Sequence, residues 1–384
     1  MRRLIAIALT ILYQIGISAG FVSDSVPTEN MGIPSEDAYT QAQITSRVPW
    51  DMVISDDKLY LGGGDYGANT GPVDIWCMDL STKEWSVSGS LNDEAIGKFI
   101  TVGERVYAPG FDAKNSTWEY GNYHWLEKGV WNTNPLLPDA VHNFDIIQYE
   151  DQLFFAIGTG NAATSPVKKS SDDGATFSDV SFIKNGTSLF DNSQFDFTRV
   201  YDFFLTDQGL YCMLLAVTDG VAPSYDFYHY SDDAFHFIST HSQIKLNIKS
   251  MKQEPISSKV TYKGSCYIAA WYLSRTSDFQ TVEQIVLPRN EVAIDLLVDH
   301  DRLYVLSAEL KDEYCTVRIY AYIYNSFFYP VASFDASNLP ASFVKYNNTF
   351  YIGLNKRGYD KDIAGSIHQV TVPELTIQLL EDCS

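Results

Sequence analysis

Aspartates recur at one position of a pattern that repeats along the chain, and they have the clearest potential for chemistry. This position lies nine residues before a recurring aromatic residue, and its seven copies hold Asp51, Lys98, Asp145, Asp202, Ser258, Asp295 and Ser342. Carboxylate oxygens are preferred ligands of Ca²⁺, and two suitably spaced carboxylates can hydrolyse a glycosidic bond. The candidate calcium ligands are Asp51, Asp145, Asp202 and Asp295. The candidate catalytic residues are Asp145, Asp202 and Glu254.

Charged residues stand at the start of the same segments. They are Arg47, Glu94, His142, Arg199, Glu254 and Glu291. His142 and Arg199 precede Asp145 and Asp202 by three residues, so we take Arg47, His142 and Arg199 as candidate binding residues. A structural role for the aspartates is the alternative, in which each caps backbone N–H groups of the neighbouring repeat. A recurring position is what that role predicts, because every repeat meets the same packing problem.

The pattern itself is a β-rich run, a polar turn, and an aliphatic residue followed by an aromatic one. Its aromatics are Tyr60, Tyr107, Phe154, Tyr211, Tyr267, Tyr304 and Tyr351, which lie 37 to 57 residues apart. A period of this length fits four short strands, which make one propeller blade. We therefore predict an all-β fold, a seven-bladed β-propeller of four-stranded blades. Six or eight blades, or a β-sandwich, are the alternatives.

Two motifs resemble those of known propellers. The stretch "SSDDGATF" carries Ser170, Asp172, Gly174, Thr176 and Phe177, and it resembles the Asp box (BNR repeat) of sialidase-type propellers, while "YSDDAFHF" at 230–237 is a decayed copy. The stretch "LYLGGGDYGANTGPVDIWCMDLSTKEW" resembles a kelch repeat. In such propellers the Asp box is the turn between the third and fourth strands, so the resemblance implies a structural role for Asp172. The Arg-Ile-Pro stretch of sialidases is absent, so the resemblance implies the fold rather than that activity.

Long loops on one face of the predicted ring are the expected place for binding. They span residues 63–74, 110–123, 158–169 and 216–226, and their candidate stacking aromatics are Tyr66, Trp118, Tyr120 and Tyr225. The leading functional hypothesis is non-catalytic recognition of a glycan or an extracellular protein through this face. A glycoside hydrolase or lyase that uses the channel carboxylates is the second hypothesis, and a purely structural surface module is the third. No cofactor is required, although Ca²⁺ fits the aspartate position.

The ends and the composition of the chain constrain the remaining expectations. Residues 1–20 combine Arg2 and Arg3 with an apolar run and a small-residue exit, which is typical of a secretory signal peptide. Residues 21–46 read as an extended acidic lead-in, and 47–381 as one propeller domain. We expect a secreted or cell-surface monomer with no membrane span after signal removal. A net charge of −21 makes nucleic acid an unsuitable partner.

Overall fold

The computed structural model describes residues 27–34, 49–64, 71–114, 119–159, 164–191, 195–218, 224–240, 258–324, 327–358 and 364–373. Within these ranges the chain is almost entirely β-strand, with a single 3-10 turn at Pro288–Asn290 and no α-helix. No helix in these ranges has the length and apolar character needed to cross a membrane.

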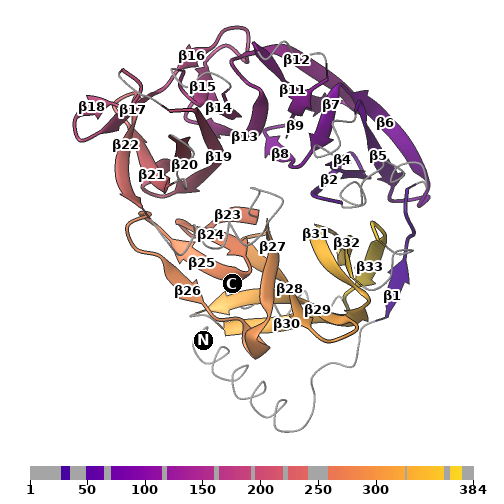
Figure 1. Ribbon diagram of the computed structural model, residues 1–384. Helices are drawn as coiled ribbons and strands as arrows, with labels where there is room; N and C mark the ends of the chain where they lie inside the picture. Colours follow the sequence, from indigo (N-terminus) through magenta and orange to yellow (C-terminus); the bar gives the residue numbers. More distant parts are fainter. Residues whose placement is uncertain are drawn as a thin grey trace.

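Largely antiparallel sheets are arranged in a ring (Figure 1). Residues of several first strands line a central cavity, which we call the channel. Five of the sheets have four strands. The first two are β2 (Met52–Ser55), β3 (Lys58–Leu61), β5 (Val73–Asp79) and β6 (Trp85–Leu91), then β8 (Ile100–Val102), β9 (Arg105–Pro109), β11 (Tyr120–Glu127) and β12 (Val130–Pro138). The next two are β23 (Ser258–Tyr262), β24 (Ser265–Ala270), β25 (Tyr272–Thr276) and β26 (Glu283–Ile285), then β27 (Val292–Asp299), β28 (Arg302–Leu310), β29 (Cys315–Tyr324) and β30 (Phe327–Ala336). The fifth is β1 (Thr28–Asn30), β31 (Asn338–Tyr346), β32 (Thr349–Gly358) and β33 (Ile367–Thr371).

The middle of the chain forms one sheet of thirteen strands. Its strands are β4 (Gly63–Gly64), β7 (Asp93–Ile96), β10 (Phe111–Ala113), β13 (His142–Tyr149), β14 (Gln152–Gly158), β15 (Val167–Ser170), β16 (Ser178–Asp179), β17 (Ser181–Lys184), β18 (Thr187–Ser188), β19 (Phe197–Thr206), β20 (Gly209–Val217), β21 (Ser224–Ser231) and β22 (Ala234–Thr240). The predicted all-β propeller is confirmed. The prediction of seven separate four-stranded blades is wrong, as are six and eight, since the described residues form five four-stranded blades.

Short strand pairings between successive repeats join them into the thirteen-stranded sheet. Gly64 pairs with Ala95, Phe111 pairs with His142, and Gly158 pairs with Arg199. Each pairing joins the residues just after the second strand of one repeat to the start of the next repeat, so strands that the sequence pattern assigns to separate blades share hydrogen bonds. β17 also pairs in parallel with β22 across two repeats. The periodicity of the sequence predicts the repeats, but it does not predict these hydrogen bonds between neighbouring repeats.

The N-terminal lead-in completes the last sheet. β1 pairs antiparallel with β33, which joins strands from the two ends of the chain. This edge strand lies within residues 21–46, which the sequence predicts to be an extended lead-in. A hydrogen bond also helps to close the ring, since the Ser342 hydroxyl donates to the Pro49 carbonyl at 2.7 Å.

The hydrophobic core lies between neighbouring sheets, because each strand alternates its side chains between the two faces. Phe350 and Tyr304, from adjacent sheets, pack edge to face at 5.3 Å. Four cysteines are buried in strands and free, namely Cys77, Cys212, Cys266 and Cys315, while Cys383 lies outside the described residues. They act as small buried apolar side chains of the core.

The Asp box forms the turn between β15 and β16, the third and fourth strands of their repeat. Asp172 Oδ1 accepts from the Thr176 backbone N–H at 2.8 Å and from the Ser170 hydroxyl at 2.8 Å. Its Oδ2 accepts from the Thr176 hydroxyl at 2.7 Å. Gly174 has φ +83°, a left-handed conformation that side chains resist. The predicted structural role of Asp172 is therefore confirmed.

Replacing Asp172 with alanine is expected to lower the melting temperature by a few degrees, because three hydrogen bonds of the turn are lost. Asp151→Ala, at an exposed aspartate of the β13–β14 turn, is the matched control. Thermal unfolding followed by circular dichroism measures both variants. Equal melting temperatures for the two would show that the turn does not depend on the carboxylate.

Candidate functional site

The recurring aspartates bind backbone N–H groups of the neighbouring repeat. Asp51 accepts from Phe99 N at 2.7 Å, Asp145 from Phe203 N at 2.9 Å, and Asp295 from Phe343 N at 2.9 Å. Each also accepts from the N–H of the residue that follows it. The structural alternative raised by the sequence is therefore confirmed for these three residues.

β-bulges turn three of these aspartates toward the next strand. The register shifts between Asn143 and Asp145, between Val200 and Asp202, and between Ala293 and Asp295. A bulge adds one residue to a strand and redirects the side chains beside it. The added residues Phe144 and Tyr201 are buried, and their rings lie 4.6 Å apart.

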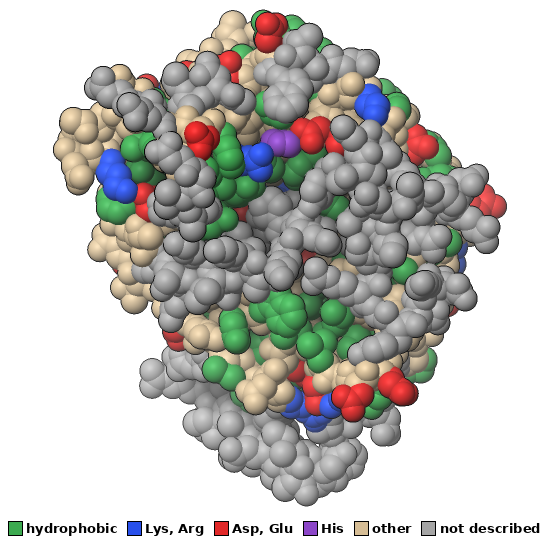
Figure 2. Space-filling view, viewed as in Figure 1, with side chains coloured by type: hydrophobic (Ala, Val, Ile, Leu, Met, Phe, Trp, Pro, Cys, Tyr) green, Lys and Arg blue, Asp and Glu red, His purple; other side chains and the backbone are tan. Residues whose placement is uncertain are grey.

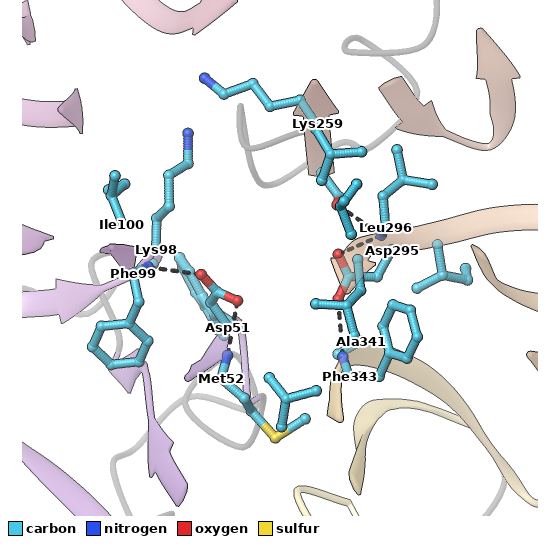
Figure 3. Close-up of a pocket in the computed structure, with 18 of the residues that line it drawn as sticks. Asp51, Met52, Lys98, Phe99, Ile100, Lys259, Asp295, Leu296, Ala341 and Phe343 are labelled. Atoms are coloured by element: carbon cyan, nitrogen blue, oxygen red, sulfur yellow. Dashed lines mark hydrogen bonds between the residues drawn. The ribbon is translucent and has the colours of Figure 1, made fainter. Parts of the chain in front are cut away.

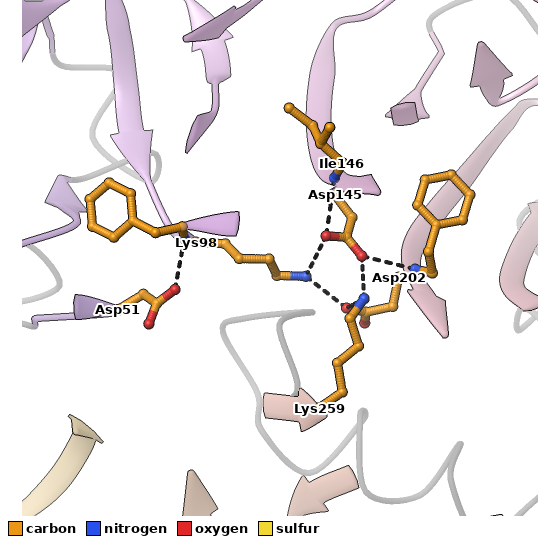
Figure 4. Close-up of polar contacts among 8 residues, drawn as sticks. Asp51, Lys98, Asp145, Ile146, Asp202 and Lys259 are labelled. Carbon is orange, nitrogen blue, oxygen red and sulfur yellow. Dashed lines mark hydrogen bonds and ion pairs between the residues drawn. The ribbon is translucent and has the colours of Figure 1, made fainter. Parts of the chain in front are cut away.

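Asp145 and Asp202 are neutralised by two lysines (Figure 4). Lys98 Nζ lies 2.8 Å from Asp202 Oδ1 and 3.4 Å from Asp145 Oδ1. Lys259 Nζ pairs with Asp145 and lies 3.1 Å from Asp202 Oδ1. All four side chains are buried or nearly so. We call these residues the lysine–aspartate cluster, and its formal charge is zero.

The cluster favours the ionised forms of Asp145 and Lys98. Burial alone would raise the pKa of Asp145, but the ammonium groups of Lys259 and Lys98 outweigh it and hold that pKa below its usual range. Burial alone would lower the pKa of Lys98, but Asp145 and Asp202 outweigh it and raise that pKa above its usual range. A carboxylate in this environment is a poor proton donor, so Asp145 is unsuited to general acid catalysis.

Asp51 and Asp295 behave differently, on opposite walls of a channel cavity of about 680 Å³ (Figure 3). Burial and, to a smaller extent, the Asp295 carboxylate raise the pKa of Asp51 to about 7, against the hydrogen bonds from backbone N–H groups. Burial likewise raises the pKa of Asp295 to about 6, against the hydrogen bonds from Ser258 and from backbone N–H groups. Both side chains open on the cavity and are only half-buried.

The four aspartates are therefore not brought together as one calcium site. Two are paired with lysines, and the other two lie on opposite walls. Within the described ranges, no three His, Cys, Asp or Glu side chains are close enough to hold a metal ion. Asp145 and Asp202 share the lysine–aspartate cluster and are not a free catalytic pair, while Glu254 lies outside the described residues.

The predicted binding residues His142 and Arg199 do come together, at the entrance to the channel. His142 on β13 stands opposite Gly158 on β14, and Gly158 stands opposite Arg199 on β19. Residues opposite one another in a sheet present their side chains on the same face. A Cβ at Gly158 would lie 3.0 Å from His142 Cδ2 and 3.4 Å from Arg199 Cγ. The pairing of β14 with β19 brings the His142 and Arg199 side chains to the same place, and Gly158 leaves room for both.

Aromatic rings surround this entrance. Phe144 lies 5.2 Å from His142 and 5.5 Å from Phe111, measured between ring centroids. Trp50 lies 6.5 Å from Phe111. Figure 2 shows one face of the ring, on which histidine, basic, acidic and hydrophobic side chains gather near the centre.

Sequence reasoning missed Trp271, which lines the channel cavity. Its φ is +69°, a genuine outlier for so bulky a residue. Two backbone hydrogen bonds to Ala293 of the next sheet, at 3.2 and 3.1 Å, hold it there. Trp271 stands four residues after the recurring Tyr267, where Phe111 and Gly158 stand in their own repeats. A comparison of the fourth residue after the recurring aromatic in every repeat would have indicated that these residues lie at the channel entrance.

The other predicted site residues differ in exposure and in location. Tyr120 is 46% exposed, as a binding aromatic requires, whereas Tyr225 is 9% exposed and packs in the core. The prediction that Tyr225 stacks on a ligand is wrong because β21 points its side chain inward. Glu291 is buried and paired with Arg318. Arg47, Tyr66 and Trp118 lie outside the described residues.

The fold and the channel define a class of protein: a ring of antiparallel sheets whose first strands line a central cavity is a β-propeller. No protein-family model matches the sequence, and no curated protein matches it.

Solved structures match this chain at very low sequence identity. A chain in the crystal structure of the mitotic checkpoint complex is 6% identical, with a TM-score of 0.51 over 91% of this chain and 95% of that one. The β-propeller domain of the Trilobed protease from Pyrococcus furiosus is 9% identical, with a TM-score of 0.46 over 79% and 88%. Polysaccharide lyase Uly1 is 9% identical, with a TM-score of 0.41 over 91% and 98%. Likeness at this level concerns the fold alone.

Proposed function

We propose that this protein is a non-catalytic recognition protein that binds a glycan at the channel entrance. One observation carries the proposal. Among the described residues, the exposed aromatic side chains are Tyr120, Tyr272 and Tyr314, at 46%, 55% and 43% exposure. All three stand at connections between the second and third strands of their sheets. They therefore lie on the face of the ring that holds the channel entrance. Aromatic side chains with a polar tip suit sugar rings.

Trp271 supplies the inner part of the proposed binding surface. It is half-buried and lines the cavity that opens among these connections. Strained backbone is often found at binding sites, where the surrounding structure holds it in place. A recess with the Trp271 ring on its wall is better suited to bind a sugar unit than to bind a broad protein surface. A protein ligand remains the outcome to expect if no glycan binds.

The channel aspartates give little support to a hydrolase or lyase. Asp145 and Asp202 are held by Lys98 and Lys259, and Asp51 and Asp295 each bind two backbone N–H groups. The likeness to kelch and Asp-box propellers enters this proposal as architecture only. Export through the segment 1–20 and action outside the cell belong to the same proposal, because extracellular glycans are the ligands that an exported propeller meets.

Trp271→Asn tests the proposal with little cost to folding. Asparagine adopts positive φ readily, so the variant relieves backbone strain while it removes the ring. On a glycan array, the variant is expected to bind the best wild-type ligand about tenfold more weakly, with an unchanged melting temperature. Lys263→Asn, at another positive-φ position on a turn of the opposite face, is the matched control. Equal binding by both variants would remove Trp271 from the site.

A further inference from the structure

Arg199 is held in place without a carboxylate partner among the described residues. Its guanidinium lies over the Phe197 ring, with Cζ 4.9 Å from the ring centroid. Its Nη1 donates to the Tyr201 hydroxyl at 3.3 Å, and no described carboxylate pairs with it. Arginine carries five N–H donors in a planar fork, so most of them are not used by these contacts.

His142 forms the other side of the same corner. Its Nδ1 lies 2.8 Å from Asp112 Oδ1, and its ring lies 5.2 Å from the Phe144 ring. Both His142 and Arg199 flank Gly158, where any side chain would meet them and Phe144. The corner is therefore built by three adjacent strands, β13, β14 and β19, and not by a mobile surface side chain.

Building on the proposed glycan recognition, we infer that the Arg199–His142 corner binds the carboxylate of an acidic glycan. A planar guanidinium presents two parallel N–H groups to a carboxylate, and stacking on an aromatic ring orients it in advance. The neighbouring rings of Phe144 and Phe197 lower the local dielectric constant, which strengthens such a contact. The preferred sugar unit is therefore a uronic-acid type rather than a neutral one.

The net charge of −21 opposes an anionic ligand at long range. Binding must then depend on short contacts inside the entrance. At about 0.15 M salt, charges more than roughly 8 Å away are largely screened, so this is the appropriate condition for the test.

The experiment compares a uronic-acid oligosaccharide with the neutral oligosaccharide obtained by reducing its carboxyl groups, using isothermal titration calorimetry at about 0.15 M salt. Wild type is expected to bind the acidic form about tenfold more tightly than the reduced form. Arg199→Met is expected to lose this preference and to bind the reduced form as wild type does. Arg199→Lys, which keeps the charge but not the planar fork, is expected to lie between them.

The outcomes separate this inference from the proposed function. Equal binding of both oligosaccharides by wild type, weakened in Trp271→Asn, would overturn the carboxylate inference and leave glycan recognition standing. Absence of binding to either oligosaccharide, and to every glycan of the array, would overturn both. A preference for the acidic form that persists in Arg199→Met would also overturn the inference, because the carboxylate would then be bound elsewhere.

Discussion

Replacing Lys98 with methionine is expected to lower the free energy of unfolding by about 3–5 kcal/mol. The side chain of Lys98 is 10% exposed, and that of Asp202 is fully buried. Without the Lys98 ammonium group, two buried carboxylates share Lys259 alone, and one negative charge stays uncompensated. Methionine fills a similar volume, so the loss reports charge rather than packing. Urea denaturation measures the change.

Two further variants make this result specific. Lys98→Met combined with Asp202→Asn restores neutrality, so the double variant is expected to recover part of the loss, with a coupling energy of about 1–3 kcal/mol. Lys83→Met removes an exposed pair with Glu29, whose side chains are 44% and 56% exposed, and is expected to change stability by less than about 1 kcal/mol. A Lys98→Met protein as stable as Lys83→Met would show that the lysine–aspartate cluster does not hold the repeats together.

Stability is expected to fall by about 2–4 kcal/mol as pH rises from about 4 to about 7. Asp51 and Asp295 have folded-state pKa values of about 7 and about 6, above the ordinary value of 3.8. Between these limits the folded state keeps protons that the unfolded state releases, so the free energy of unfolding decreases with pH and then levels off. Both carboxyl groups are only half-buried, so solvent screening reduces the effect below its full linkage value. Asp145, with a lowered pKa, acts in the other direction and only below pH of about 4.

The double variant Asp51→Asn/Asp295→Asn tests the cause. It removes both titrating groups while an amide oxygen still accepts one N–H at each position. Chemical denaturation at a series of pH values is expected to give wild type a negative slope between pH of about 4 and 7, and the variant a flatter one. Identical slopes for the two proteins would assign the pH dependence to other groups.

The repeats predicted the propeller because each carries the same buried aromatic, the same turn and the same strand pattern. They did not predict the thirteen-stranded sheet, since pairings such as Gly158 with Arg199 depend on backbone positions after the ring has closed. The Asp box was predictable because Asp172 acts within its own turn. The edge strand β1 was not, because its partner β33 stands at the other end of the chain.

The candidate site was predictable in part for the same physical reason. His142 and Arg199 stand out because the recurring position aligns them, and the structure brings them together. Lys259 stands one residue after that position, so the alignment did not show that it neutralises Asp145 and Asp202. Trp271 was missed because a half-buried tryptophan at the end of a strand looks like a core residue until its backbone conformation is known.

A glycan-array screen of the intact protein, followed by mass spectrometry of every bound glycan, tests the central claim most directly. The account predicts that bound glycans are recovered uncleaved, and that binding weakens in Trp271→Asn but not in Lys263→Asn. Recovery of shortened or unsaturated products, lost in Asp51→Asn/Asp295→Asn, would contradict it and would make the channel carboxylates catalytic.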